Sequence, residues 1–546
     1  MHRILFLVTA LFISITTVAQ RQTLSYTFTY DTTAMELKVQ VQLKGNSTGR
    51  SYLMLPDQFA DQGELYKAIQ QIEVTTPAAR ISSTEDSTVR LITHQPNENL
   101  QFTYILKQDW KGSFTSPLNN RAVLKRDYMQ CTGYGLLVVP RMDSSQPVSV
   151  QLNWTGLPAG WQIGNSLHVQ TRTYNGQVTL NELLNSIYVA GDFRIYQQQV
   201  RGQPVYVALR GRGWKFSDSA FANTITKILG MQRQFWNDYA EPYYFVSLIP
   251  YDGTGTSNGS ALHQSFMMAS TKDFGLELSL LRLLTHEYFH RWNGNKIAFT
   301  GDEFRNKWFS EGFTDYYAYK LLYKQGLISL PDYIKAINGN ISDYYLSPVW
   351  SKDRATAAKN FWNTADYNNL PYRKGCVYAL YLDQLIKQNS KNRHSLDNVM
   401  HDLLKRSNTN LPVTETYFLD LIKAYSGYSI HDQHRKFIDE GGLIPVHPQS
   451  LGVLAKLRFI SIGAFDAGFD LGPSWKARKI EGVKENSAAW KAGIRNGLLL
   501  NGYSMNSADV QAPVQIQVEE NGTKKTISYV AMSAEKIEVP QFQLKN

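Results

Sequence analysis

Long hydrophobic runs and cysteines are both scarce in this sequence of 546 residues. Beyond the first residues, no apolar stretch is long enough for a transmembrane helix, which needs about 20 residues. The two cysteines, Cys131 and Cys376, lie far apart in the chain. A chain of this size does not need a disulfide framework, so we expect both to be buried as small hydrophobic side chains.

Runs of one charge are also absent. The 56 basic and 46 acidic residues, which give a net charge of +10, are scattered, and no run of five or more basic residues occurs. Without a basic patch or a nucleic-acid motif, this charge indicates a solubility feature and no nucleic-acid partner. The sequence also lacks long internal repeats and low-complexity tracts.

The N-terminus has the pattern of a secretory signal. His2 and Arg3 give a short basic start, residues 4–15 are apolar, and residues 17–19 offer a small-residue cleavage site. We expect residues 1–19 to be a signal peptide and the mature chain to be secreted or periplasmic, with no membrane anchor after cleavage. An N-terminal anchor is the alternative, but the apolar run is short for a bilayer.

The length predicts three or four domains. Residues 20–205 alternate apolar and polar positions at period two, as in LSYTFTYD, and predict a β-sandwich-like domain. Residues 206–440 change to helical spacing around a few strands, which predicts a mainly α domain with a small β-sheet. A linker follows at 441–454, where GGLIPVHPQS is rich in glycine and proline. Residues 455–546 return to strands and tight turns around one short helix.

The stretch LLTHEYFHRWNGNK, residues 283–296, carries two histidines four positions apart on an apolar helical pattern. In a helix, His286 and His290 lie on one face and can present their imidazoles to one ion. Glu287 follows the first histidine, where it can reach a reacting water rather than the ion itself. The plainer alternative is a solvated helix face whose histidines are satisfied by other partners.

A catalytic zinc site usually has three protein ligands and one open position. Glu311 is the candidate for the third ligand, because the twenty residues after His290 allow a loop and a return onto a second helix. Asp315 lies four positions further on the same face, where it can accept the outer N–H of a ligating histidine and fix its tautomer. Two imidazoles suit zinc better than magnesium or calcium, so we expect one zinc ion.

HEYFHRWN, followed by KWFSEGFTDYY, resembles the glycyl aminopeptidase family of gluzincin metallopeptidases (family 61). That family has an N-terminal β domain, a thermolysin-like catalytic domain and a PDZ domain, and the resemblance is strongest from about 240 to 385. It implies that His286, His290 and Glu311 are zinc ligands and that Glu287 is the general base. The implied fold is therefore multidomain, with a thermolysin-like catalytic domain and a C-terminal PDZ-like α+β domain.

PYRKG, residues 371–375, is the next matching piece. Related gluzincins carry a tyrosine before x-Lys-Gly whose hydroxyl steadies the tetrahedral oxyanion, and the resemblance puts Tyr372 in that place. A phenol donor aimed at developing negative charge stabilises the transition state more than the ground state. The alternative is a tyrosine that only packs at the start of a helix.

One motif departs from the family. A strand is expected there whose glutamate grips the free α-amino group of the substrate. The corresponding strand here contains Ser260, Ala261, Leu262 and His263, which we expect to bind substrate, and Leu262 stands where the acid is expected. Leucine cannot pair with an ammonium ion. Asp252 or Glu303 is a possible substitute acid, and strand addition remains available for the substrate backbone.

The C-terminal residues resemble a PDZ domain. Gly468, Phe469, Asp470 and Leu471 lie where a carboxylate-binding loop is expected, and SAAWKAG matches the helix and turn that follow. Backbone N–H groups of such a loop capture a C-terminal carboxylate, so a C-terminal peptide is a possible partner. A degenerate module that only packs on the catalytic domain is the alternative. His431 and His434 are also closely spaced, but they lack a third ligand and we expect them on the surface.

Together these features predict a zinc peptidase that acts on peptides or proteins, most simply an aminopeptidase that removes Gly or Ala. The departure at Leu262 leaves an endopeptidase or an altered exopeptidase as the runner-up. A third hypothesis is a non-catalytic peptide-binding protein that uses the PDZ-like module.

Overall fold

The computed structural model describes residues 22–545 except 61, 116–117 and 506–509, so the predicted signal peptide lies outside the described residues. The chain divides into two compact units. Among the described residues, unit 1 comprises those up to 222 and 241–274, and unit 2 comprises 223–240 and those from 275 onward. The expected multidomain architecture, with a β-rich N-terminal region and a helical domain after it, is confirmed.

The units do not follow the predicted boundary at residue 205. Strand β16 (Gln203–Leu209) pairs with β15 (Arg194–Val200) on one side and with β17 (Tyr244–Pro250) on the other. A boundary after residue 205 would therefore cut through the hydrogen bonds of one sheet. The predicted boundary lies inside β16, and the division into compact units falls at residues 222–223 instead.

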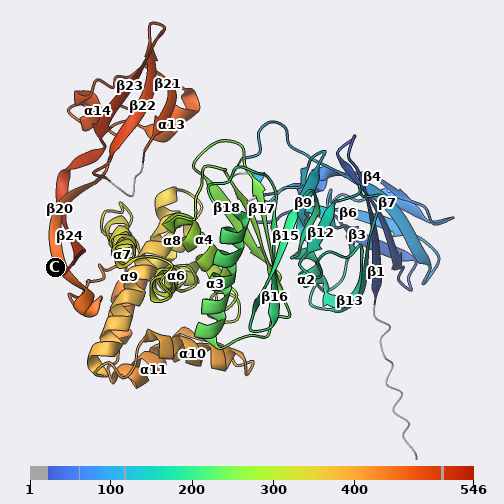
Figure 1. The fold of residues 1–546 in the computed structure, drawn as a ribbon, viewed down its shortest axis with the longest axis horizontal. Coiled ribbons are helices and arrows are strands. Elements are labelled where there is room, and N and C mark those ends of the chain that lie inside the picture. The colour runs from blue at the N-terminus through green and yellow to red at the C-terminus, as the bar shows by residue number, and fades with distance from the viewer. Residues whose placement is uncertain (1–21, 61, 116–117, 506–509, 546) are drawn as a thin grey trace, which may run out of the picture. The chain divides into compact units, whose positions relative to one another are not determined.

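The described residues of unit 1 form four sheets. Many of their strands are labelled in Figure 1. The first has the order β13-β11-β1-β2-β7-β4, with β1 (Thr23–Asp31), β2 (Glu36–Lys44), β4 (Ile69–Val74), β7 (Asn99–Lys107), β11 (Pro147–Thr155) and β13 (Thr173–Thr179). The second has the order β10-β3-β6-β5, with β3 (Arg50–Met54), β5 (Arg80–Ser83), β6 (Val89–Thr93) and β10 (Val139–Pro140). The third has the order β12-β14-β9-β8, with β8 (Val123–Leu124), β9 (Tyr128–Thr132), β12 (Gln162–Asn165) and β14 (Ile187–Gly191). The fourth has the order β15-β16-β17-β19-β18, with β18 (Ser257–Leu262) and β19 (Ser265–Ser270) in addition to the strands given above. Two short helices, α1 (Gly133–Leu136) and α2 (Leu180–Leu184), connect strands.

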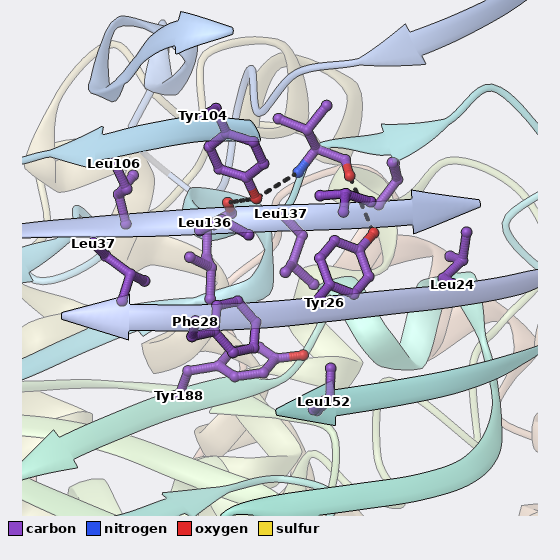
Figure 2. Packing of buried hydrophobic residues seen from close by; sticks show 14 of the residues in the cluster. Leu24, Tyr26, Phe28, Leu37, Tyr104, Leu106, Leu136, Leu137, Leu152 and Tyr188 are labelled. Atoms are coloured by element: carbon purple, nitrogen blue, oxygen red, sulfur yellow. Dashed lines mark hydrogen bonds between the residues drawn. The ribbon is translucent and has the colours of Figure 1, made fainter. Parts of the chain in front are cut away.

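Period-two alternation builds the core of unit 1. Along β1, every second side chain is buried, including Tyr26 and Phe28. The buried tyrosines keep partners for their hydroxyls: Tyr26 donates to the carbonyl of Val138 at 3.0 Å, and Tyr104 donates to the carbonyl of Leu136 at 2.8 Å (Figure 2). Burying a hydroxyl without a partner would cost stability, so these bonds allow large aromatic residues inside the sheets.

Unit 2 is mainly helical. Its helices include residues 223–236 of α3 (Asp218–Trp236), followed by α4 (Leu278–Phe289), α5 (Glu303–Ser310), α6 (Gly312–Lys324), α7 (Leu330–Tyr345), α8 (Arg354–Lys359), α9 (Ala365–Asn389), α10 (Leu396–Ser407), α11 (Glu415–Ser426) and α12 (His431–His434). Gly375 of α9 packs directly on Gly312 of α6. The two helices lie so close that a Cβ atom on either glycine would collide with backbone of the other helix or of α5. In the described part of the chain, none of the helices combines the length and the apolar character that crossing a membrane requires.

The C-terminal part of unit 2 contains a two-stranded arm and a small module. Strands β20 (Ala455–Phe465) and β24 (Met532–Leu544) pair with each other in a two-stranded arm. The arm contacts α7, where the Asn338 side chain exchanges two hydrogen bonds of 2.8 Å with the backbone of Phe542. A small module lies between the two arm strands and contains α13 (Leu471–Ala477), α14 (Ala488–Lys491), β21 (Leu499–Ser504), β22 (Pro513–Glu520) and β23 (Thr523–Val530). Cys131 and Cys376 are both free and buried, as expected.

Candidate metal centre

Two neighbouring helical segments supply the predicted ligands. Helix α4 is anchored by buried leucines on its apolar face, and it carries His286, which is 3% exposed. His290 is the residue that follows the last turn of α4 and keeps a helical backbone. Glu311 lies between α5 and α6, also with a helical backbone, and is 6% exposed. Glu311, which directly precedes α6, therefore lies next to His286 and His290.

The structure brings the three side chains together around one point. The Nε2 atoms of His286 and His290 lie 3.0 Å apart, and each lies 3.2 Å from Oε2 of Glu311. Zinc–nitrogen bonds of about 2.0–2.1 Å in a tetrahedral site imply ligand atoms about 3.3 Å apart. The observed triangle therefore fits two imidazoles and a carboxylate that share one ion.

The outer nitrogens of both histidines face oxygen acceptors. Nδ1 of His286 lies 2.8 Å from Oδ1 of Asp315, and Nδ1 of His290 lies 3.0 Å from the carbonyl oxygen of Asn293. A carbonyl accepts and does not donate, so Nδ1 of His290 carries the proton, and an ionised Asp315 requires the same of His286. This tautomer directs both Nε2 lone pairs toward the shared point, which is the arrangement that a metal ion needs.

Asp315 is fully buried and is held by cations. Arg282 donates to Oδ1 from both Nε, at 2.8 Å, and Nη2, and Arg373 lies 3.4 Å from Oδ2. Burial alone would raise the pKa of this carboxyl, but Arg282 and His286 outweigh burial and lower the pKa well below the usual range. Asp315 is therefore ionised and able to orient His286.

The charges of the ligand set call for a cation. Burial opposes the ionised form of Glu311, yet the two histidines hold its pKa well below the usual range. Burial also lowers the pKa of His290, but Glu311 and Glu287 outweigh it and raise that pKa to about 9. The pocket thus stabilises positive charge at the point where the three ligand atoms converge. Two imidazole nitrogens and one carboxylate oxygen are a ligand set that suits zinc.

Two further predicted residues lie beside the ligands. Glu287 is partly buried on α4 between the two histidines, and its carboxylate makes no hydrogen bond or ion pair with any described residue. The ring of Tyr372, from α9, stacks on the ring of His286 with centroids 5.9 Å apart. Burial, and then the carboxylates of Glu311 and Glu287, raise the pKa of Tyr372 above its usual value, so its hydroxyl keeps its proton.

The predicted substrate strand is β18, the edge strand of the five-stranded sheet, and it belongs to unit 1. Leu262 is 8% exposed and packs in an apolar cluster of that unit, so its side chain points into the interior. Ser260 donates to Oδ1 of Asn120 at 2.7 Å. Ala261 is partly buried, and Nε2 of His263 lies 2.9 Å from the amide nitrogen of Gln264.

The proposed substitute acids have other partners. Asp252 of unit 1 accepts a hydrogen bond of 2.7 Å from the backbone of Phe114. Glu303 of unit 2 is highly exposed and pairs with Lys307 at 2.9 Å. The carboxylate of Asp252 therefore already accepts a backbone hydrogen bond, and Glu303 forms an ion pair within α5.

The predicted carboxylate loop of the C-terminal module takes a different local form. The amide of Gly468 donates to Asp466, and the amide of Asp470 donates to the carbonyl of Glu481 at 3.0 Å. Phe469 is buried in the core of the module, and Leu471 packs against that core. Asp470 precedes helix α13 rather than a strand. Two of the amides expected to hold a carboxylate are thus engaged, and helix α13 begins within the predicted loop, at Leu471.

His434 corrects another expectation. His431 is exposed, but His434 is buried, with Nε2 2.6 Å from Glu415 and Nδ1 2.9 Å from the hydroxyl of Tyr378. Glu415, His434 and Asp439 cluster closely enough to resemble a metal site. However, the Arg354 guanidinium bonds Glu415 twice, at 2.9 and 2.8 Å, and Asp439 at 3.1 Å, so a cation already neutralises this cluster.

Several residues of the metal centre were not predicted. Arg282 and Arg373 hold Asp315, Asn293 accepts from His290, and Lys307 lies 3.1 Å from Oε1 of Glu311. Arg282 lies four positions before His286, and Lys307 four before Glu311, so helical spacing carried a signal for both. Nothing in the local sequence indicates that Arg373, on a distant helix, reaches Asp315.

Comparisons with known proteins give one family match and several similar solved structures. Residues 279–379 match the family model described as M61 glycyl aminopeptidase. An aminopeptidase N family protein from Idiomarina loihiensis is 16% identical, with a TM-score of 0.72, and the match covers 96% of this chain and 98% of that chain. This likeness extends the shared fold over nearly the whole chain.

More distant structures are also similar to this chain. The M1 zinc metallopeptidase from Deinococcus radiodurans is 16% identical with a TM-score of 0.48, over 78% of this chain and 95% of that chain. Yeast LTA4 hydrolase is 15% identical with a TM-score of 0.48, over 78% and 69%. No curated protein matches the chain. Residues 279–379, which include the histidine pair, Glu311 and Tyr372, match the M61 glycyl aminopeptidase model, and we conclude that the chain is a peptidase that is similar to this family over that stretch.

Proposed function

We propose that the chain is a zinc-dependent peptidase whose single zinc ion is held by His286, His290 and Glu311. The observation that carries the proposal is the triangle of Nε2, Nε2 and Oε2 atoms, 3.0–3.2 Å apart, with both Nδ1 atoms satisfied elsewhere. Zinc, when bound, supplies a Lewis acid that polarises the scissile carbonyl and acidifies the attacking water.

Glu287 is the general base and then the general acid. Its carboxylate has no other hydrogen-bonding partner among the described residues, so it is free to accept a proton from the attacking water. As the C–N bond breaks, Glu287 delivers that proton to the leaving amine. General acid–base catalysis of this kind contributes roughly 10²–10⁴-fold to the rate.

Tyr372 stabilises the oxyanion. Its hydroxyl is protonated at neutral pH because burial and nearby carboxylates raise its pKa. A donor that meets the oxyanion, and not the ground-state carbonyl, lowers the barrier to attack. Its stacking on His286 ties the position of the donor to that of a zinc ligand.

The finer assignment is an aminopeptidase that removes Gly or Ala from peptides, which rests on the family resemblance. A specific observation favours a second candidate, an endopeptidase or altered exopeptidase: Leu262 is packed in an apolar cluster, so position 262 offers no carboxylate for a free amino group. We further propose a secreted or periplasmic location, and a C-terminal peptide as a ligand of the module between β20 and β24.

The test compares hydrolysis of Ala- and Gly-peptides, free and N-acetylated, by wild type, Glu287→Gln and Glu440→Gln. Glu440 is exposed on unit 2 and serves as the matched control. We expect chelator-sensitive hydrolysis by wild type and Glu440→Gln, and loss of at least about 100-fold with Glu287→Gln. Cleavage of acetylated peptides supports the endopeptidase candidate. Bound zinc without Glu287-dependent hydrolysis would identify a non-catalytic peptide-binding protein.

A further inference from the structure

Trp362 is a large apolar side chain that remains 72% exposed. It lies in the turn at 360–363 that joins α8 to α9, and α9 carries Tyr372. Tryptophan is enriched where proteins contact partners, because its ring combines a large apolar surface with one N–H donor.

Trp362 belongs to a group of three aromatic rings. Its ring centroid lies 4.7 Å from that of Phe361 and 6.2 Å from that of Phe304, and the two phenylalanines lie 5.4 Å apart. Phe361 is 3% exposed and lies buried beneath the group, whereas Phe304 of α5 is partly buried. We call these three residues the aromatic cluster.

The turn that presents Trp362 is held by hydrogen bonds. The backbone and side-chain amides of Asn363 donate to Asn360 at 2.8 and 2.7 Å. The side chain of Asn360 in turn donates to the carbonyl of Thr356 in α8 at 2.8 Å. The aromatic ring is therefore presented on an ordered turn, which lowers the entropic cost of binding a ligand.

Lys307 links the aromatic cluster to the metal centre. Its ammonium lies 5.9 Å from the centroid of Phe361 and 3.1 Å from Oε1 of Glu311. Lys307 lies one helical turn after Phe304 on α5, and only 17% of its side chain is exposed. Lys307 thus contacts both the aromatic cluster and a predicted zinc ligand.

We propose that the aromatic cluster is a substrate subsite that holds a large apolar side chain on the residue after the scissile bond. This inference rests on the proposed function. The glycine or alanine removed in the proposed function has almost no side chain to fill such a surface, so the second residue of the substrate is the one that does. Burying a leucine or phenylalanine side chain there removes apolar surface from water and so favours binding of that substrate.

The test measures kcat/KM for Ala-Phe-amide and Ala-Gly-amide, with Phe-Ala-amide as the reversed substrate. Wild type is expected to prefer Phe at the second position, and Trp362→Ala is expected to reduce the Phe-to-Gly ratio about tenfold. Trp475→Ala, which removes a partly exposed tryptophan of the C-terminal module, is expected to keep the wild-type ratio. An unchanged ratio in Trp362→Ala, or a preference for Phe at the first position only, would overturn the proposal.

Calorimetric binding separates this proposal from the proposed function. Purified Glu287→Gln protein, with and without Trp362→Ala, is titrated with the same two amides, so no turnover is needed. Tighter binding of Ala-Phe-amide that is lost with Trp362→Ala supports the subsite even if no peptide is hydrolysed. Equal binding of both amides by Glu287→Gln protein contradicts it even if the wild type is an active peptidase.

Discussion

The Nε2 atoms of His286 and His290 lie 3.0 Å apart, while both Nδ1 atoms face oxygen acceptors. Two Nε2 lone pairs that face each other at this distance repel unless a proton or a metal ion lies between them, which agrees with the raised pKa of His290. The chain holds this arrangement through Asp315 and the carbonyl of Asn293, so the geometry is set by residues outside the ligand triangle. Preset lone pairs reduce the reorganisation that metal binding requires.

Asp315→Asn tests the orientation of His286. The substitution keeps the shape but removes the charge that fixes the Nδ1–H tautomer, and it leaves Arg282 and Arg373 without their shared anion. We expect zinc affinity, measured by competition with a chromogenic chelator, to fall about 10–100-fold. Asp343→Asn removes another Arg373 partner and is the control. Equal affinities for the two variants would contradict the role of Asp315.

Gly375→Ala tests the close contact of α9 with α5 and α6. The new methyl group would collide with the carbonyl oxygen of Trp308 and lie 2.9 Å from Cα of Gly312. We expect the free energy of unfolding, measured with denaturant, to fall by about 3 kcal/mol or more. Gly339→Ala on α7 meets nothing within 4 Å and is expected to be neutral or to stabilise by up to about 1 kcal/mol. Similar effects of both changes would show that the contact is unimportant.

Leu262→Glu tests whether this position can supply the missing amine-binding carboxylate. The side chain points into an apolar cluster of unit 1, so the new carboxylate would be buried without a partner. We expect a loss of about 3 kcal/mol in stability and no gain of aminopeptidase selectivity. Leu262→Met, which keeps the volume, should cost less than about 1.5 kcal/mol. A stable Leu262→Glu protein that gains selectivity for free amino groups would overturn this assignment.

Glu415 gives unit 2 an acid sensitivity. Burial raises the pKa of its carboxyl, but bonds from His434 and Arg354 outweigh burial and lower that pKa to about 2, from 4.5. A depressed pKa means that the contribution, on the order of 2–3 kcal/mol, is present above about pH 4.5 and is lost as the pH falls toward 2. Glu415→Gln should therefore flatten the fall of the denaturant midpoint between pH 5 and 2.

That measurement is made with a chelator present, so that metal release does not contribute. Glu440→Gln, at an exposed position, should keep the wild-type pH dependence. If Glu415→Gln has the same dependence as wild type, the buried bonds of Glu415 do not set the acid stability.

Local spacing made part of the site predictable. Residues four apart lie on the same face of a helix. The pairs His286 with His290 and Glu311 with Asp315 could therefore be recognised from the sequence as neighbours. The β-rich N-terminal region was also predictable, because apolar and polar residues alternate along strands such as β1 and match the alternating burial of their side chains.

Long-range pairing explains what was missed. Strands β20 and β24 are separated by the whole C-terminal module, and β16 pairs with β17 across α3, so neither partner is visible in a local window. Arg373 reaches Asp315 only after α9 packs against α6. His434 appeared to be a surface residue because its partners, Tyr378 and Glu415, come from two other helices.

The most direct measurement is the metal content of protein purified without added metal, for wild type and Glu311→Gln. The variant keeps the shape of the side chain but removes the charge that completes the ligand triangle. The account predicts one zinc ion per wild-type chain and little or none in Glu311→Gln. A wild-type chain without zinc, or a variant that retains zinc as tightly as wild type, would contradict it.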